Sequence, residues 1–175
     1  NRLAPRQKVR DFIPDFSTSA SNLPALKAHL AITKGCNNYC SFCVVPLTRG
    51  TEVSRSPQNI LEEATRLCVN GTREICLLGQ NVNSYHANGV DFVELLQQLD
   101  GIKNLERIRF TSPHPKDFHP KLADAMTSLP SVCEQLHLPL QSGSNEVLKR
   151  MRRWYTTQTY LEKVEMFHSR MPEGT

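Results

Sequence analysis

Three cysteines close together in the sequence have the spacing of a metal centre. Cys36, Cys40 and Cys43 form a C-x3-C-x2-C pattern within eight residues. Soft thiolate ligands select iron-sulfur clusters, zinc or cuprous copper. Structural zinc sites and electron-transfer four-iron clusters are closed by four protein ligands, whereas three cysteines leave one metal position open for a substrate. The spacing alone leaves open a zinc site completed by one of the six histidines.

The remaining three cysteines are interpreted as packing residues. Cys68 lies on an apolar helix face and Cys76 lies within an apolar strand, while Cys133 stands apart from the other five. Free cysteine in such positions behaves as a small hydrophobic residue. Three disulfides would be typical of a short secreted chain, and 175 residues are enough to form a core without them.

The overall composition indicates a soluble globular protein. Hydrophobic residues make up 39% and charged residues 22%, and the sequence has no apolar run long enough to span a membrane. No signal-peptide pattern is present, so we expect a cytoplasmic protein without membrane contact. Lysine and arginine exceed the acidic residues by 21 to 17. This excess weakly favours polyanionic partners, or it merely keeps the protein soluble.

Short apolar runs alternate with segments of helical spacing, which predicts an α/β fold. Parallel strands require crossovers of this length, so the architecture is either a barrel or an open doubly wound sheet. The helix around Ile60 is expected to begin with Ser56 as its cap and Pro57 in its first turn, and to end at Gly71. The predicted strands are His29–Thr33, Glu74–Leu78, Arg107–Thr111 and Gln135–Leu138, and the helical faces are Ile60–Cys68, Phe92–Leu99, Leu122–Leu129, Val147–Met151 and Tyr160–His168.

Polar segments follow each of the four predicted strands. In both candidate architectures, chemistry gathers at the carboxyl ends of the strands. The sequence therefore predicts one functional edge, to which each strand contributes its following loop. These loops are Gly35–Cys43, Gly79–Asn81, Ser112–His114 and Gln141–Gly143.

The sequence divides into a lead-in and a core. Residues 1–28 are rich in proline, serine and charge and have no apolar period, so we expect a linker. Residues 29–175 form the expected catalytic core. Because the chain starts at Asn1 rather than methionine, we expect a piece of a longer protein.

Longer motifs around the cysteines resemble a known family. The pattern C-x3-C-x-aromatic-C after a first strand is the signature of radical S-adenosylmethionine enzymes, and Cys36, Cys40, Phe42 and Cys43 match it. The segments CSFCVVPLTRGTEVSR, LLGQNVNSY, FTSPHPKDF and LHLPLQSGSNEVLKRMRRWYT resemble the methylthiotransferases of that superfamily. They are most similar to the tRNA branch, MiaB, whose members are tRNA-2-methylthio-N6-dimethylallyladenosine synthases. The resemblance extends from Leu23 to Met171.

The resemblance implies a reaction and its cofactors. The three cysteines would ligate a four-iron four-sulfur (4Fe-4S) cluster whose open iron binds S-adenosylmethionine. One-electron cleavage would yield a 5'-deoxyadenosyl radical that removes hydrogen from C2 of N6-isopentenyladenosine beside the tRNA anticodon. Sulfur insertion with a second 4Fe-4S cluster, held by the missing amino-terminal domain, and methylation would follow. The expected protein is thus a metal-binding transferase of tRNA processing that needs an electron donor and is monomeric at full length. Its fold would be a partial parallel (β/α) barrel truncated after about four units.

The resemblance also suggests roles for residues beyond the cysteines, each with a structural alternative. Phe42 would pack near the adenine of the cofactor, or would be a core residue. Gly79 and Gln80 would receive its methionine amino group. Four strand-end residues would face cofactor or substrate, unless they only form turns. They are Thr111, Ser112, Gln141 and Ser142.

Five charged residues are candidates for substrate binding. Arg49, Glu52 and Arg55 match the family's R-G-x-E-x-S-R loop, which would contact substrate or be tied down by an ion pair. Arg152 and Arg153 belong to a basic run next to Trp154 and Tyr155 that would bind phosphates and stack a base. The alternative for this run is a solvated helix end. The histidines His114, His119 and His137 are given no metal role, and no catalytic residue is expected beyond the cluster ligands.

Two other functions compete with methylthiolation of tRNA. One is the same chemistry on a ribosomal protein, which the amino-acid sequences of the LLGQNVNSY and VVPLTRG segments disfavour. The other is a non-enzymatic iron-sulfur or zinc-binding module, which would leave the polar segments at successive strand ends without a purpose.

Overall fold

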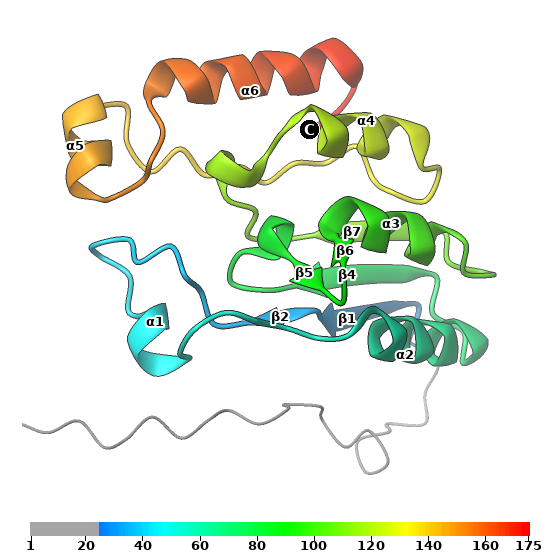
Figure 1. Cartoon of the computed structure of the whole chain (residues 1–175). Helices are drawn as coiled ribbons and strands as arrows, with labels where there is room; N and C mark the ends of the chain where they lie inside the picture. The colour runs from blue at the N-terminus through cyan, green and yellow to red at the C-terminus, as the bar shows by residue number, and fades with distance from the viewer. Residues whose placement is uncertain (1–24) are drawn as a thin grey trace, which may run out of the picture.

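A short parallel sheet lies at the centre of the protein. The computed structural model describes residues 25–175, so most of the predicted lead-in lies outside the described residues. Strands β1 (Lys27–Ala31), β4 (Glu74–Leu78) and β7 (Arg107–Phe110) pair in parallel in the order β1-β4-β7 (Figure 1). Because neighbours in the sheet follow one another along the chain, every crossover runs in the same direction.

The helices stand in one layer beside this sheet. Helix α2 (Pro57–Val69) contacts α3 (Phe92–Asp100), α3 contacts α4 (Pro120–Ser128), and α4 contacts α6 (Thr157–Arg170). Figure 1 shows this succession from α2 to α6. A doubly wound sheet would carry helices on both faces, whereas a single helical layer is the arrangement of a (β/α) barrel segment. The expected fold class is confirmed.

Shorter elements occupy the loops between these units. Strand β2 (Thr33–Lys34) pairs antiparallel with β3 (Val53–Ser54), and helix α1 (Val45–Thr48) lies between them in the chain. Strands β5 (His86–Ala87) and β6 (Val90–Asp91) form a hairpin before α3. The remaining elements are the 3-10 helices η1 (Val82–Ser84) and η2 (Pro115–Asp117) and helix α5 (Asn145–Arg150).

Helix α2 begins where the sequence predicts. Ser56 caps α2 by accepting a hydrogen bond from the Asn59 N–H, and Pro57 occupies the first turn. The helix ends at Val69, two residues before Gly71, whose φ is +103°. Capping boxes also start α3 and α6. None of the helices within residues 25–175 is both long and apolar enough to cross a membrane.

The predicted fourth strand at Gln135–Leu138 is wrong. The sheet continues beyond β7 by a single parallel bridge between Ile108 and Val132, three residues earlier than predicted. After this bridge the backbone finds other partners, since the Leu136 N–H donates to the carbonyl of Thr175 and the Tyr160 hydroxyl donates to the carbonyl of Leu138. The apolar side chains of this segment still pack against the core, which explains the strand-like sequence pattern.

Gly35 allows the chain to turn sharply from β2 into the cysteine loop. Its φ is +77°, and a Cβ atom at this position would lie 2.2 Å from the carbonyl oxygen of Thr51. Both the backbone conformation and the close approach therefore require glycine.

We predict that Gly35→Ala lowers the free energy of unfolding by about 2–4 kcal/mol, because it combines left-handed backbone strain with a backbone clash. Gly89 is the matched control, since its φ is +79° and nothing lies within 4 Å of its Cβ position. Gly89→Ala should cost only about 1 kcal/mol. Urea denaturation of both variants measures the difference, and equal losses would contradict the role of the close approach.

Candidate functional site

A cavity of about 250 Å³ gathers residues from five separate segments at the carboxyl ends of the strands. The cysteine loop follows β2, and Gln80 and Ser112 follow β4 and β7. Segments from beyond the sheet close the other side. The lining residues are Cys36, Asn38, Cys40, Phe42, Cys43, Gln80, Ser112, Pro113, His114, His137, Pro139, Gln141 and Arg153.

The three cysteines of the spacing motif all line this cavity as free thiols. Cys36 and Cys40 are buried, and Cys43 is half-buried. Burial raises the pKa of the Cys36 thiol, and a hydrogen bond from the Asn38 N–H to its sulfur lowers it in part. A bound metal supplies the positive charge that such a buried thiol needs in order to ionise.

The three thiols fit a metal centre with three cysteine ligands. They come from one loop and line one cavity, and thiolates are the usual ligands of iron-sulfur clusters. Three protein ligands leave one position of such a centre open for another ligand.

Four of the seven predicted cofactor-binding residues line the cavity, namely Phe42, Gln80, Ser112 and Gln141. The amide oxygen of Gln80 also accepts a hydrogen bond of 2.7 Å from the Gly35 N–H, which anchors the start of the cysteine loop.

The other three predicted residues stand outside the cavity lining. Gly79 permits close packing, since a Cβ there would lie 2.2 Å from the Thr33 hydroxyl oxygen. The Thr111 N–H extends the sheet by donating to the carbonyl of Leu77, and the Ser142 hydroxyl accepts from the Ser144 N–H within a turn. Their visible contacts are thus structural.

In the loop Arg49–Arg55, the side chain of Arg55 is bound by protein groups. Its guanidinium lies 2.6 Å from the Glu63 carboxylate and donates to the Ala31 carbonyl 2.8 Å away. The ion-pair alternative therefore accounts for Arg55. Glu52 accepts a hydrogen bond from the Ser84 hydroxyl, and burial raises the pKa of its carboxyl group. Arg49 is exposed.

The structure separates the two arginines that the sequence grouped together. Arg152 is exposed and faces another pocket, whereas Arg153 is only 6% exposed and lines the cysteine cavity. The Arg153 guanidinium donates to the Cys40 sulfur at 3.3 Å and to the Tyr155 hydroxyl at 3.1 Å. No carboxylate among the described residues pairs with it. A buried cation of this kind favours negative charge in the cavity, carried by thiolates or by a bound ligand.

His114 is a cavity residue that sequence reasoning did not select. The Asn83 side chain fixes its backbone, donating to the His114 carbonyl and accepting from the His114 N–H. Its Nδ1 atom accepts from the Lys116 N–H, so the neutral ring carries its proton on Nε2. Nε2 is buried without a hydrogen-bond partner in the described part of the chain. It is a free donor for a ligand in the cavity.

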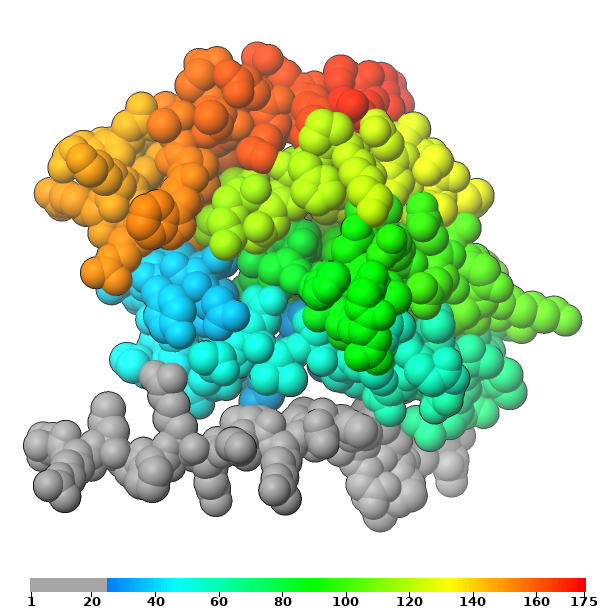
Figure 2. Space-filling model, viewed as in Figure 1, coloured from blue at the N-terminus to red at the C-terminus, as the bar shows by residue number. Residues whose placement is uncertain are grey.

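Contacts across the chain close the cavity. The Ser41 N–H donates to the carbonyl of Met151 at 3.1 Å, and the Ser41 hydroxyl donates to the carbonyl of Arg150 at 2.8 Å. Figure 2 shows the surface around residue 40 lying directly against the segment around residue 150. The cysteine loop is thus held from both the sheet side and the α5 side.

Comparison with known proteins supports the family that the cysteine motif resembles. Residues 30–175 match the model of the radical SAM superfamily. A tRNA-2-methylthio-N(6)-dimethylallyladenosine synthase of Protochlamydia amoebophila is 51% identical over 151 residues, covering 84% of this chain and 34% of the relative. A synthase of the same name from Thermoanaerobacter sp. strain X514 is 46% identical over 173 residues, covering 94% and 37%. The chain therefore spans about a third of the length of these curated relatives.

Solved structures share the fold at low sequence identity. The radical S-adenosylmethionine methyltransferase TsrM from Kitasatospora setae, solved with tryptophan substrate and a SAM analog, superposes with a TM-score of 0.65 at 17% identity. The match covers 82% of this chain and 28% of that one. The cobalamin-dependent S-adenosylmethionine radical enzyme OxsB also gives 0.65, at 16% identity, over 81% and 22% of the two chains.

The buried His114 ring makes a testable prediction about pH. Burial, with the nearby charges of Arg153 and Lys116, lowers the pKa of His114 to about 3. The unfolded chain binds this proton near pH 6.5, so the contribution to stability is complete above that value. It is lost as pH falls from about 6.5 towards 3, by at most about 1.4 kcal/mol per pH unit.

Nitrogen-15 NMR of the imidazole should show an unprotonated Nδ1 and a protonated Nε2 at pH 5. His114→Gln should flatten the pH dependence of unfolding in this range, and His86→Gln, at an exposed position, is the control. A midpoint near 6.5 for His114 would contradict the buried, neutral assignment.

Proposed function

This chain belongs to the radical SAM superfamily, and we propose that it is the catalytic core of a transferase that methylthiolates N6-isopentenyladenosine in tRNA. The observation that carries the proposal is the convergence of three free thiols on one cavity at the carboxyl ends of parallel strands. The proposed substrate is taken from relatives at 42–52% identity, which are named tRNA-2-methylthio-N(6)-dimethylallyladenosine synthase.

Cys36, Cys40 and Cys43 would hold the cluster, and the superfamily implies both a 4Fe-4S cluster and S-adenosylmethionine. When bound, this pair of cofactors supplies the one-electron chemistry that activates a carbon–hydrogen bond of the substrate. We assign the remaining roles to protein groups. Gln80 holds the cysteine loop through Gly35, and Arg153 offsets negative charge next to Cys40.

The cavity also provides groups that orient a polar ligand. His114 donates from Nε2 to an acceptor atom without adding charge, because its ring stays neutral. Ser112 and Gln141 offer further hydrogen bonds from the cavity wall. Phe42 is 55% exposed at the cavity mouth, where its ring can limit water access to an adenine-sized group.

The proposal extends to the whole protein of which these residues form a part. Residues 1–28 would link an amino-terminal domain, which holds a second 4Fe-4S cluster, to the catalytic core at 29–175. An electron donor would reduce the cluster, and the full-length enzyme would act as a cytoplasmic monomer without membrane contact. Support comes from the motifs in the sequence and from relatives of whose length this chain spans about a third.

The first test concerns the cluster. After anaerobic reconstitution with iron and sulfide, Cys40→Ser should lower the iron content by about four atoms per chain, because the cluster loses one of its three ligands. Cys68→Ala is the matched control, since Cys68 is 2% exposed on α2 and outside the cavity. Iron and sulfide analysis checks the result, and one tightly bound zinc without sulfide would refute the cluster.

The second test concerns the substrate. Bulk tRNA from a strain lacking the gene should contain N6-isopentenyladenosine without its 2-methylthio group. Mass spectrometry of nucleosides from digested tRNA detects this loss, and a plasmid copy should restore the modification. A plasmid copy with Cys40→Ser should not restore it. An unchanged amount of the 2-methylthio nucleoside in the deletion strain would refute the proposed substrate, even if the cluster were present.

A further inference from the structure

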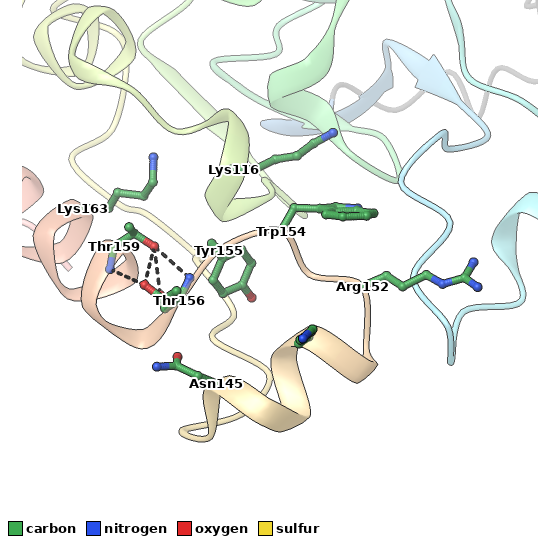
Figure 3. A pocket seen from close by; sticks show the side chains of 9 residues that line it. Lys116, Asn145, Arg152, Trp154, Tyr155, Thr156, Thr159 and Lys163 are labelled. Atoms are coloured by element: carbon green, nitrogen blue, oxygen red, sulfur yellow. Dashed lines mark hydrogen bonds between the residues drawn. The ribbon is translucent and has the colours of Figure 1, made fainter.

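A second pocket, larger than the cysteine cavity, lies between the end of α5 and the start of α6. Its volume is about 620 Å³, compared with about 250 Å³ for the cysteine cavity. Figure 3 shows Tyr155 between Trp154 and Thr156, with Lys163 on one side and Arg152 on the other. We name it the basic pocket, because every charged residue that lines it is a cation. These residues are Lys116, Lys149, Arg152 and Lys163.

Two of the four cations are bound by protein groups. Lys163 donates to the carbonyl of Phe118, and Lys116 lies 4.0 Å from the carboxylate of Asp117. Within residues 25–175, the side chains of Lys149 and Arg152 have neither a hydrogen-bond partner nor an ion-pair partner. A pocket with unpaired cations and no acidic lining residue is suited to an anionic ligand.

The pocket also presents an aromatic surface to solvent. Trp154 is 73% exposed, the largest exposed fraction of any aromatic residue in the described chain. Its φ is +53° and that of Arg152 is +57°, a left-handed conformation that costs free energy for residues with a Cβ atom. The strained backbone thus turns an indole ring outward next to unpaired cations. Cations that bind phosphate beside a ring that stacks a base are the combination that single-stranded nucleic acid requires.

The segment Arg152–Tyr155 forms the wall between the basic pocket and the cysteine cavity. Successive side chains face opposite sides, since Arg152 and Trp154 line the basic pocket while Arg153 lines the cavity. The Tyr155 ring lines the basic pocket and also meets the ring of His114, a cavity residue, edge to face at 5.8 Å. Only the side chains of this segment would therefore separate a nucleic-acid strand in the basic pocket from the cysteine cavity.

We propose that the basic pocket binds the single-stranded RNA next to the modified nucleotide, with a phosphate at Lys149 and Arg152 and a base stacked on Trp154. This inference rests on the proposed function, because it names the part of the substrate that the same enzyme holds. The neighbouring nucleotide would then enter the cysteine cavity.

Binding of a fluorescein-labelled single-stranded oligoribonucleotide to the reconstituted full-length protein tests the inference by fluorescence anisotropy. Combined Lys149→Gln and Arg152→Gln should weaken binding at least tenfold. The slope of log affinity against log salt should also decrease in magnitude by about 0.7, because the contact with one phosphate is lost. Arg150→Gln is the matched control, since Arg150 is an exposed cation of α5 outside the pocket lining.

Trp154 is tested separately from the charges. Trp154→Ala should weaken binding by about five- to hundredfold without changing the salt slope, and Trp154→Tyr should restore most of the affinity, because a ring remains for stacking. Iron content and thermal melting of each variant show whether the fold is retained.

The outcomes separate this inference from the proposed function. Wild-type binding that is unaffected by the pocket variants, or weakened equally by Arg150→Gln, would overturn the basic pocket while leaving the proposed function intact. Failure of the wild-type protein to bind any RNA would overturn the proposed function as well.

Discussion

Hydrogen bonds from the cysteine loop to the segment at the end of α5 hold together the parts that form the site. The Ser41 hydroxyl reaches the carbonyl of Arg150 across 109 residues of sequence, and the Arg153 guanidinium reaches the Cys40 sulfur across 113. Neither segment belongs to the sheet, so strand pairing does not fix their distance. These contacts close the cavity and place the Arg153 charge beside the Cys40 thiol, a proposed cluster ligand, where a carboxylate partner would cancel the effect of that charge.

Much of the fold follows from local sequence signals. Buried parallel strands read as continuous apolar runs, and the Glu74–Leu78 prediction matches β4 residue for residue. Helix α2 is equally visible, because Ser56 and Pro57 are strong start signals. The failure at Gln135–Leu138 has a physical cause. An apolar run shows that side chains are buried, but it does not show which backbone groups accept the hydrogen bonds.

The site was predictable where its residues share one loop or directly follow a predicted strand. The cysteine spacing lies within one loop, so sequence alone predicted that Cys36, Cys40 and Cys43 belong to one centre, and the three thiols do line one cavity. Contacts between segments far apart in the sequence bring Arg153 and His114 into the same cavity. Nothing local distinguishes the buried Arg153 from the exposed Arg152, and His114 owes its place to the distant amide of Asn83.

Backbone strain links the two pockets. Among the seven non-glycine residues with positive φ in the described chain, Ser112 and Gln141 line the cysteine cavity and Arg152 and Trp154 line the basic pocket. Glycine would adopt these conformations at lower cost, but it has no side chain to direct. At Arg152 and Trp154 the strain turns a cation and an indole towards the basic pocket, while Arg153 between them enters the cysteine cavity. The same short segment thereby separates the cavity that contains the buried Arg153 cation from an open surface suited to a polyanion, and keeps the two next to each other.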